Sequence, residues 1–501
     1  MAAGFQSSGA TTCTSSEVVT TTAFDPQARG ARWLVLAQIT RALLLFVGVT
    51  VLSRLLTPTE FGYVAVAVAI VGVGEILRDM GLSAAAITRP DLSIGERSVL
   101  FWADVMLGLF LAMILVMSAP SIGALFDSSV LDDVLRVMSV VFVLNGVGAQ
   151  YRAELNRTLR FASLAVVDTV GPLSGIVAAV ILAVAGAGFW ALAFQIIVAS
   201  GVSTIVLVAL GRWRPGLPRE WRSSLPLLSF GIRVAGAQIL GYLGTNVDTF
   251  VLGYSSSPAQ VGFYNRAFQV GAQSIALLRD PATAIALPNL SRAVGDNLRL
   301  ERAAIAGQRV LAFTVVPVGG LLATTAFLIV PLALGETWVS IAPVVSVLAV
   351  ASAIQALASV SSWLFLARGM GGALVAYSAI SLAVKSAFIV ALVEYGALGV
   401  AWGYLGAVAV MWPIASIWAC GRTGISVVAL ARAGAVPIVL AGLGTAAGIV
   451  VSILLNASQL LSAIATTFAF FTPYMLGFCS RRIRREYSRT LRVIRGAKIE
   501  D

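Results

Sequence analysis

Long apolar stretches alternate with short polar segments from about Trp33 to Phe478. A stretch of about 20 apolar residues is long enough to cross the hydrocarbon core of a bilayer as a helix. Breaks at glycine, proline and charge clusters predict about fourteen transmembrane helices, so the fold class is predicted to be all-α integral membrane. These spans are expected near 33–54, 62–86, 99–118, 131–151, 163–185, 188–210, 226–253, 260–286, 310–333, 341–366, 372–393, 397–419, 433–454 and 459–478.

Arginine is concentrated in every second loop between these spans. Cytoplasmic loops retain Arg and Lys, so this alternation predicts that both termini are cytoplasmic. Arg54 is the one arginine that breaks the pattern, because it falls in a predicted outer loop. The arginines of the predicted cytoplasmic loops are Arg89, Arg97, Arg152, Arg157, Arg160, Arg212, Arg214, Arg219, Arg222, Arg292, Arg299, Arg302, Arg309, Arg368, Arg422 and Arg432.

The composition is typical of a membrane protein and argues against several other classes of protein. Of the 501 residues, 58% are hydrophobic and 11% are charged, which is too apolar for a soluble globule. The net charge of +11 follows from the arginine-rich loops and the basic tail, so it does not indicate nucleic-acid binding. The chain has no histidine, its three cysteines are far apart, and no Gly-Lys-Ser/Thr phosphate loop occurs. We therefore expect no catalytic triad, metal site, disulfide framework or ATP-binding loop, and no cofactor.

The chain also carries an internal repeat, as transporter folds commonly do. At an offset of two hundred residues and without a gap, Leu52, Pro58, Gly62, Tyr63 and Ala67 align with Leu252, Pro258, Gly262, Phe263 and Ala267. A second similarity relates the Gly-Ala-Gly-Phe-Trp sequence at 186–190 to the segment 396–402. The repeat predicts two six-helix bundles followed by two additional helices.

This organisation predicts six segments. The first, 1–28, is expected to be a disordered cytoplasmic tail, because it is rich in Ser, Thr and Ala and lacks the basic and apolar regions of a cleavable signal. The others are an N-terminal lobe at 29–211, a cytoplasmic linker at 212–225, a C-terminal lobe at 226–420, two additional transmembrane helices at 421–480 and a basic cytoplasmic tail at 481–501.

Polar residues inside the predicted spans indicate a wet interior, because a charge at the bilayer centre costs about 3 kcal/mol or more unless it faces protein or water. Four cations lie within spans without an obvious partner in sequence, and Gln269 and Gln273 share a helical face with one of them. Guanidinium groups bind phosphate through charge-assisted hydrogen bonds, so the passenger is predicted to be anionic, as a sugar phosphate or glycolipid headgroup would be. The four cations are Arg41, Arg233, Arg266 and Lys385.

Several segments resemble one known family. They read SRLLTPTEFGYVAVAVAIVGVGEILRDMGLSAAAI at 53–87, SVLFWADVMLGL at 98–109, GAGFWALAFQ at 186–195, NVDTFVLGYSSSPAQVGFYNRAFQV at 246–270 and LPNLSRAVGD at 287–296, with GETW at 335–338 and LARG at 366–369. The chain is similar here to the Wzx-like bacterial polysaccharide repeat-unit flippases of the multidrug/oligosaccharidyl-lipid/polysaccharide exporter superfamily. The match is strongest for the lipopolysaccharide and exopolysaccharide type.

The resemblance implies a two-lobed bundle whose central cavity opens alternately to either side of the bacterial cytoplasmic membrane. It implies that the passenger is a polyprenyl-pyrophosphate-linked oligosaccharide carried to the outer leaflet, with membrane lipids and a polysaccharide polymerase or assembly proteins as partners. Asn246 and Asp248 fall in the family's Asn-x-Asp segment. We expect Asn246 to join the cations and glutamines in binding substrate, and Asp248, Glu75 and Asp79 to be candidates for ion or proton coupling.

Three rival functions stay open at this point. A drug or cation antiporter of the same superfamily would favour an acidic cavity. A peptidoglycan-precursor flippase would share both the architecture and a cationic cavity. A membrane glycosyltransferase or polymerase would need an acid/base or metal constellation on a sizeable outer loop, and the predicted outer loops are short, so we expect no enzyme.

Overall fold

A computed structural model describes residues 40, 43, 44, 46–79, 81–83, 86, 93–218, 221–454, 459–479 and 484, with the backbone alone for 221–237, 459–460 and 478–479. The described part is built from helices. In the first half these are a helical segment at Phe46–Leu55, α2 (Pro58–Asp79), α4 (Ile94–Leu125), α5 (Ser129–Met138), α6 (Val140–Arg157), α7 (Phe161–Val184) and α8 (Phe189–Leu210).

The second half begins with α9 (Trp221–Ser255), which starts inside the predicted linker. It continues with α10 (Pro258–Phe268), a π-helix η1 (Gln269–Gln273), α11 (Ser274–Arg292), α12 (Asn297–Leu334), a 3₁₀ turn η2 (Glu336–Ile341), α13 (Ala342–Ala367), α14 (Gly371–Leu392), a 3₁₀ turn η3 (Val393–Tyr395) and α15 (Gly396–Thr423). Two further helices follow, α16 (Val427–Leu454) and α17 (Gln459–Cys479).

Each predicted span overlaps a helical segment of the described residues. The span predicted at 131–151 is divided between α5 and α6, the one at 260–286 runs through α10, η1 and α11, and much of the one at 33–54 lies outside the described residues. Eight helices in the described part are long and apolar enough to cross a membrane, and two shorter apolar helices lie at Phe46–Leu55 and Leu461–Gly477. The all-α membrane fold class is therefore confirmed. The count of fourteen crossings and the six segment boundaries stay predictions.

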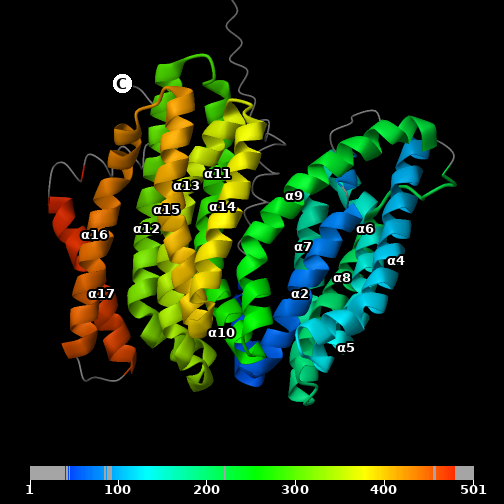
Figure 1. The fold of residues 1–501 in the computed structure, drawn as a ribbon, viewed down its shortest axis with the longest axis horizontal. Helices are drawn as coiled ribbons and strands as arrows, with labels where there is room; N and C mark the ends of the chain where they lie inside the picture. The colour runs from blue at the N-terminus through cyan, green and yellow to red at the C-terminus, as the bar shows by residue number, and fades with distance from the viewer. Residues whose placement is uncertain are drawn as a thin grey trace, which may run out of the picture.

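The helices form two bundles that diverge from a common end (Figure 1). One bundle contains α2 and α4 to α8, and the other contains α10 to α15 with α16 and α17 on its outer side. The long helix α9 runs obliquely from the first bundle toward the point where the two meet. We call this meeting point the closed end and define it by Arg54, Pro58, Pro258 and Trp338.

The closed end is built on a reciprocal contact between the two copies of the repeat. A methyl group added to Gly62 would lie 1.7 Å from the carbonyl oxygen of Pro258, and one added to Gly262 would lie 1.8 Å from the carbonyl oxygen of Pro58. Only glycine permits helices to approach so closely. The four residues are the ones that align at the two-hundred-residue offset, so the repeat in the sequence is a pseudo-symmetric contact in space.

A second pair of equivalent contacts extends this symmetry. The side-chain oxygen Oε1 of Glu60 lies beside Gly188, and Oε1 of Gln260 lies beside Gly396, where it accepts a 2.9 Å hydrogen bond from the backbone N–H of Ala397. Both glycines have positive φ, 57° and 67°. A side chain at either glycine would be strained and would also strike the oxygen.

The π-helix η1 marks the place where the two copies lose their register. Before it, the copies align at an offset of 200, as far as Ala67 and Ala267. After it, the sequence Ile-Leu-Arg-Asp at 76–79 aligns with Leu-Leu-Arg-Asp at 277–280, at an offset of 201. A π-turn accommodates one extra residue within an α-helix. Arg279 is therefore the counterpart of Arg78.

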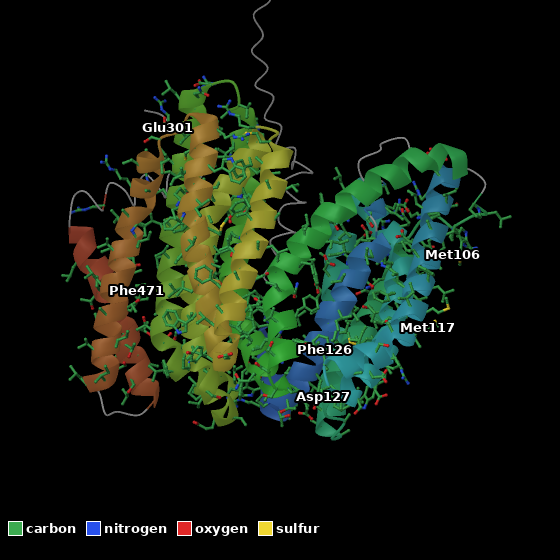
Figure 2. The ribbon with its side chains drawn as sticks, in the orientation of Figure 1. Met106, Met117, Phe126, Asp127, Glu301 and Phe471 are labelled. Atoms are coloured by element: carbon green, nitrogen blue, oxygen red, sulfur yellow. The ribbon has the colours of Figure 1, made fainter. Side chains whose placement is uncertain are left out.

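The outer flank of the bundle is apolar between two polar ends. Met106 and Met117 lie on the flank of α4 and are 52% and 74% exposed, while Asp127 and Glu301 lie at opposite ends of the molecule (Figure 2). Phe471 lies on the flank of α17 on the other side. Large exposed apolar side chains in such a band face lipid rather than water.

The close helix approach gives a stability prediction. Gly62→Ala should lower the thermal unfolding midpoint of the detergent-solubilised protein, because a methyl group would push α2 off Pro258 at a cost of about 1–3 kcal/mol. Gly241→Ala is the matched control, since nothing lies within 4 Å of its added methyl group. The control should leave the midpoint unchanged or raise it slightly. Equal midpoints for the two variants would show that the contact does not hold the closed end.

Candidate functional site

A cavity of about 380 Å³ lies between the two bundles. Its walls come from the segment around Gly48, from α2 and α8 on one side, and from α9, α10 and η1 on the other. Four of the seven predicted substrate-binding residues line it: Asn246, Arg266, Gln269 and Gln273. We call this space the inter-lobe cavity.

Arg266 is the main cation of the inter-lobe cavity among the described residues. Its guanidinium carbon lies 3.6 Å from the centroid of the Phe61 ring, and the side chain donates a 2.6 Å hydrogen bond to Oε1 of Gln269. Gln269 in turn donates to the side-chain oxygen of Asn265 at 3.0 Å, which fixes its carbonyl toward the arginine. Arg266 is 4% exposed, and its Nε has no hydrogen-bond partner. No carboxylate of the described residues forms an ion pair with it.

A buried guanidinium of this kind favours an anion. Stacking on an aromatic ring offsets part of the cost of removing the charge from water, but it does not neutralise the charge. The chemistry of the cavity therefore suits a phosphate or carboxylate group, and it disfavours a cation.

Asp248 and Lys385 form a buried ion pair that joins α9 to α14. Lys385 Nζ lies 3.2 Å from Oδ2 of Asp248 and also donates to the carbonyl oxygen of Gly244 at 2.9 Å. Tyr264 donates to the same carboxylate at 2.6 Å, and the ammonium lies 4.5 Å from the centroid of the Tyr404 ring. In this state the charge of Lys385 is compensated within the protein.

Glu75 and Asp79 belong to a separate cavity of about 410 Å³ inside the first bundle. Arg78 bridges Glu75, at 3.1 Å, and Asp104, at 3.3 Å. Gln150 donates to the second oxygen of Asp104 at 2.7 Å. The described coupling candidates therefore lie in two places: Asp248, on α9, lines the inter-lobe cavity, whereas Glu75 and Asp79 line the cavity of the first bundle.

Two predicted cations cannot be placed. Arg41 lies outside the described residues. Arg233 falls within α9, where only the backbone is described.

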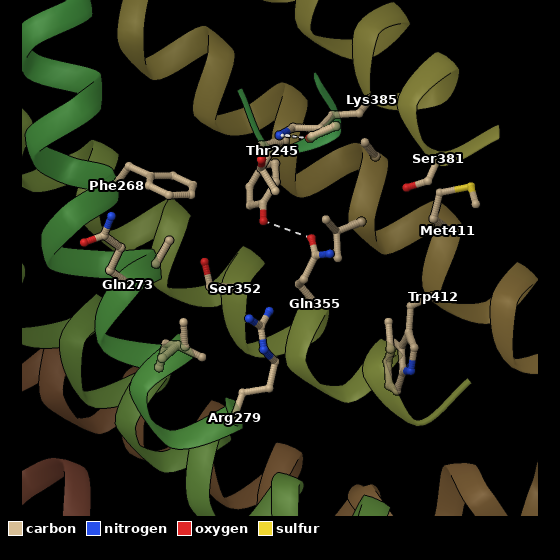
Figure 3. Close-up of a pocket in the computed structure, with 18 of the residues that line it drawn as sticks. Thr245, Phe268, Gln273, Arg279, Ser352, Gln355, Ser381, Lys385, Met411 and Trp412 are labelled. Carbon is tan, nitrogen blue, oxygen red and sulfur yellow. Dashed lines mark hydrogen bonds between the residues drawn. The ribbon is translucent and has the colours of Figure 1, made fainter. Parts of the chain in front are cut away.

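A third polar cavity, of about 160 Å³, lies within the second bundle. It is lined by residues of α9, of α10 to α11, and of α13, α14 and α15, among them Lys385 (Figure 3). Thr245, Phe268 and Gln273 line both this space and the inter-lobe cavity. We call this third space the C-lobe cavity.

The closed end contains residues whose role was not predicted from the sequence. Trp338 is fully buried, its ring nitrogen donates to the carbonyl oxygen of Ser53 at 2.6 Å, and its ring contacts Phe61 and Phe263. Arg54 donates to the carbonyl oxygens of Leu332, at 2.6 Å, and Ala333, at 3.3 Å, near the end of α12.

Arg54 thus breaks the loop-charge pattern because it caps the carbonyls of a helix from the other bundle. Trp338 ends the Gly-Glu-Thr-Trp segment at 335–338, one of the segments that carry the family resemblance. A large aromatic residue in a short connection between two spans is the signal that could have indicated a buried contact.

The two bundles, the cavity between them and the long apolar helices define the class of the fold, a two-lobed helical membrane protein. The fold is similar to that of a solved structure of the lipid II flippase MurJ in an inward closed conformation, with a TM-score of 0.68, 12% identity, and coverage of 90% of this chain and 100% of that one.

The sequence family is also defined. The profile of the polysaccharide biosynthesis protein family matches residues 51–343, more than half of the chain, so this multi-pass membrane protein belongs to that family. The lipopolysaccharide biosynthesis protein WzxC of Escherichia coli (strain K12) is 29% identical over 353 residues, 68% of this chain and 69% of WzxC. The succinoglycan biosynthesis transport protein ExoT of Rhizobium meliloti (strain 1021) is 27% identical over 374 residues, 74% of each chain.

The tryptophan contact gives a testable prediction about the closed end. In a background with the native cysteines replaced by alanine, Gln195→Cys places a thiol in the inter-lobe cavity. Trp338→Phe removes the hydrogen bond to Ser53, worth about 0.5–1.5 kcal/mol, and should make this thiol react about 2- to 10-fold faster with an impermeant reagent added at the closed end.

Trp402→Phe is the control for this measurement, because Trp402 is 52% exposed on the outside of the second bundle. It should leave the labelling rate unchanged. If Trp338→Phe labelled no faster than Trp402→Phe, Trp338 would not hold the closed end shut.

Proposed function

We propose that this protein is a flippase that moves a polyprenyl-pyrophosphate-linked oligosaccharide from the cytoplasmic to the outer leaflet of the bacterial cytoplasmic membrane. The observation that carries the proposal is Arg266, a buried guanidinium without a carboxylate partner among the described residues, in a cavity between two lobes. Membership of the polysaccharide biosynthesis protein family and the names of WzxC and ExoT support the saccharide as passenger.

In this proposal Arg266 binds the pyrophosphate, and Asn246, Gln269 and Gln273 hydrogen-bond to the headgroup. Arg41 and Arg233 add positive charge, and Lys385 contributes when its pair with Asp248 opens. The prenyl chain stays in lipid between the lobes. Both termini are cytoplasmic, so the closed end faces the outside, and breaking its contacts exposes the cavity to the outer leaflet. A polysaccharide polymerase on that side would receive the product.

Energy coupling is assigned in the same proposal to the buried carboxylates. Opening the Asp248–Lys385 pair exposes a carboxylate that can take up a proton or a cation. Uptake at this carboxylate would link the relative positions of α9 and α14 to the binding of substrate in the cavity. Glu75 and Asp79 would do the same in the first bundle.

The function is tested by deleting the gene in its host and measuring which leaflet holds the lipid-linked oligosaccharide, using an impermeant glycosidase on oriented vesicles. We expect accumulation in the cytoplasmic leaflet, reversed by the wild-type gene. The Arg266→Gln variant should insert into the membrane normally but fail to reverse this accumulation. Its export should be reduced at least tenfold, because a neutral amide cannot neutralise pyrophosphate.

Arg136→Gln is the matched control, since Arg136 makes an exposed ion pair with Asp132 and should tolerate the change. An unchanged lipid distribution in the deletion strain, together with altered drug or cation sensitivity, would favour the antiporter. Accumulation of a peptidoglycan precursor would favour the precursor flippase.

The coupling assignment predicts different results for single and double variants. Asp248→Asn alone should reduce the amount of folded protein, because it leaves Lys385 buried and unpaired at a cost of about 3–5 kcal/mol. Asp248→Asn combined with Lys385→Met should restore folding, measured by gel filtration in detergent, but should abolish the response of transport to an imposed ion gradient. A folded double variant that still responds to the gradient would remove Asp248 from the coupling mechanism.

A further inference from the structure

We propose that the C-lobe cavity is a saccharide subsite, which binds a sugar beyond the first one of the lipid-linked oligosaccharide. The inference rests on the proposed function and names where the distal part of the headgroup lies. It is carried by three observations: the lining of this cavity, its unused hydrogen-bonding groups, and its shared wall with the inter-lobe cavity.

The lining combines aromatic rings with neutral polar groups. Tyr377 supplies aromatic surface. Trp412 adds a second ring, while Gln355, Ser352 and Ser381 supply amide and hydroxyl groups (Figure 3). No carboxylate is found among the described residues that line it. A sugar ring presents an apolar C–H face and a rim of hydroxyls, each of which both donates and accepts, so it matches such a lining better than a cation or a hydrocarbon does.

Two of these groups have hydrogen-bonding capacity that the protein does not use. Ser352 is 6% exposed, and its buried hydroxyl lies near the Tyr404 phenol but makes no hydrogen bond of regular geometry. Tyr404 donates to Oε1 of Gln355 at 2.9 Å, which fixes the amide and leaves its NH₂ group as a donor. A buried polar group without a hydrogen bond lowers the stability of the protein, and a hydrogen bond from a ligand hydroxyl would offset this desolvation cost.

The repeat provides a comparison for the cation of this cavity. Arg78, in the first bundle, is bridged to both Glu75 and Asp104. Its counterpart Arg279 lines the C-lobe cavity and forms an ion pair with the adjacent Asp280, whose side chain is 58% exposed. The second bundle has therefore kept the arginine without the buried acids, which leaves its guanidinium accessible to a hydroxylated or acidic sugar.

The position of the cavity fits a headgroup held at Arg266. Thr245, Phe268 and Gln273 line both cavities, so the two spaces adjoin each other at these side chains. The volume of about 160 Å³ has room for on the order of ten water molecules, enough for one sugar ring with its hydroxyls. With the pyrophosphate and the first sugar in the inter-lobe cavity, the next sugar reaches this one.

The test compares two substrates in proteoliposomes. One is the complete oligosaccharide lipid isolated from the flippase-deleted host, and the other is the same polyprenyl pyrophosphate carrying only its first sugar. Transfer is followed by oxidation of the exposed sugar with impermeant periodate. Ser352→Ala should slow the oligosaccharide lipid about fivefold, and Ser381→Leu, which fills the cavity, at least tenfold. Neither variant should slow the one-sugar lipid.

Matched controls separate the subsite from general damage. Ser361→Ala removes another buried α13 hydroxyl without a partner, and Ser378→Leu makes the same enlargement one turn away on α14; neither residue lines the cavity. Both should move the two lipids at wild-type rates. Equal slowing of both lipids by the cavity variants, or no slowing of either, would overturn the subsite. If the wild-type protein moved neither lipid, the proposed function itself would fail, and the subsite with it.

Discussion

The close approach of α2 and α10 is the constraint on which the rest of the structure depends. Gly62 and Gly262 bring the two helices together where each would otherwise strike a proline carbonyl of the other. Because this contact lies at one end of both helices, it fixes the bundles at the closed end and leaves them to diverge elsewhere (Figure 1). The inter-lobe cavity is bounded by the same two helices. Any motion that changes access to the cavity must therefore turn about this contact or separate it.

The buried cations differ in what compensates their charge. Arg78 and Lys385 are compensated by carboxylates, so Arg78 ties α2 to α4 within the first bundle and Lys385 ties α14 to α9. Arg266 is instead stacked on Phe61, a residue of the opposite bundle. A buried charge without a counter-ion is expensive in a membrane and persists where a ligand supplies the missing charge. This contrast separates cations that hold the fold from a cation that is available to a passenger.

Much of the fold could be predicted from the sequence, because hydrophobic length and the alternation of arginine are properties of single segments. The aligned glycines and prolines also predicted the repeat. The pairing of Asp248 with Lys385 could not be predicted, since their partnership depends on how α9 and α14 pack. Trp338 and Arg54 were missed for the same reason: each contacts a backbone carbonyl far away in the sequence. Sequence spacing places a polar side chain on a face of a helix but does not identify the helix that it meets.

The π-helix η1 also records the order of events in the history of the gene. The extra residue occurs in the second copy of the repeat, and the helix α2 of the first copy runs through the equivalent position as a regular α-helix. An insertion that preceded the duplication would have been copied into both halves. The residue must therefore have been gained by the second half, or lost by the first, after the two halves had become one chain. The asymmetry between the lobes is younger than the symmetry that holds them together.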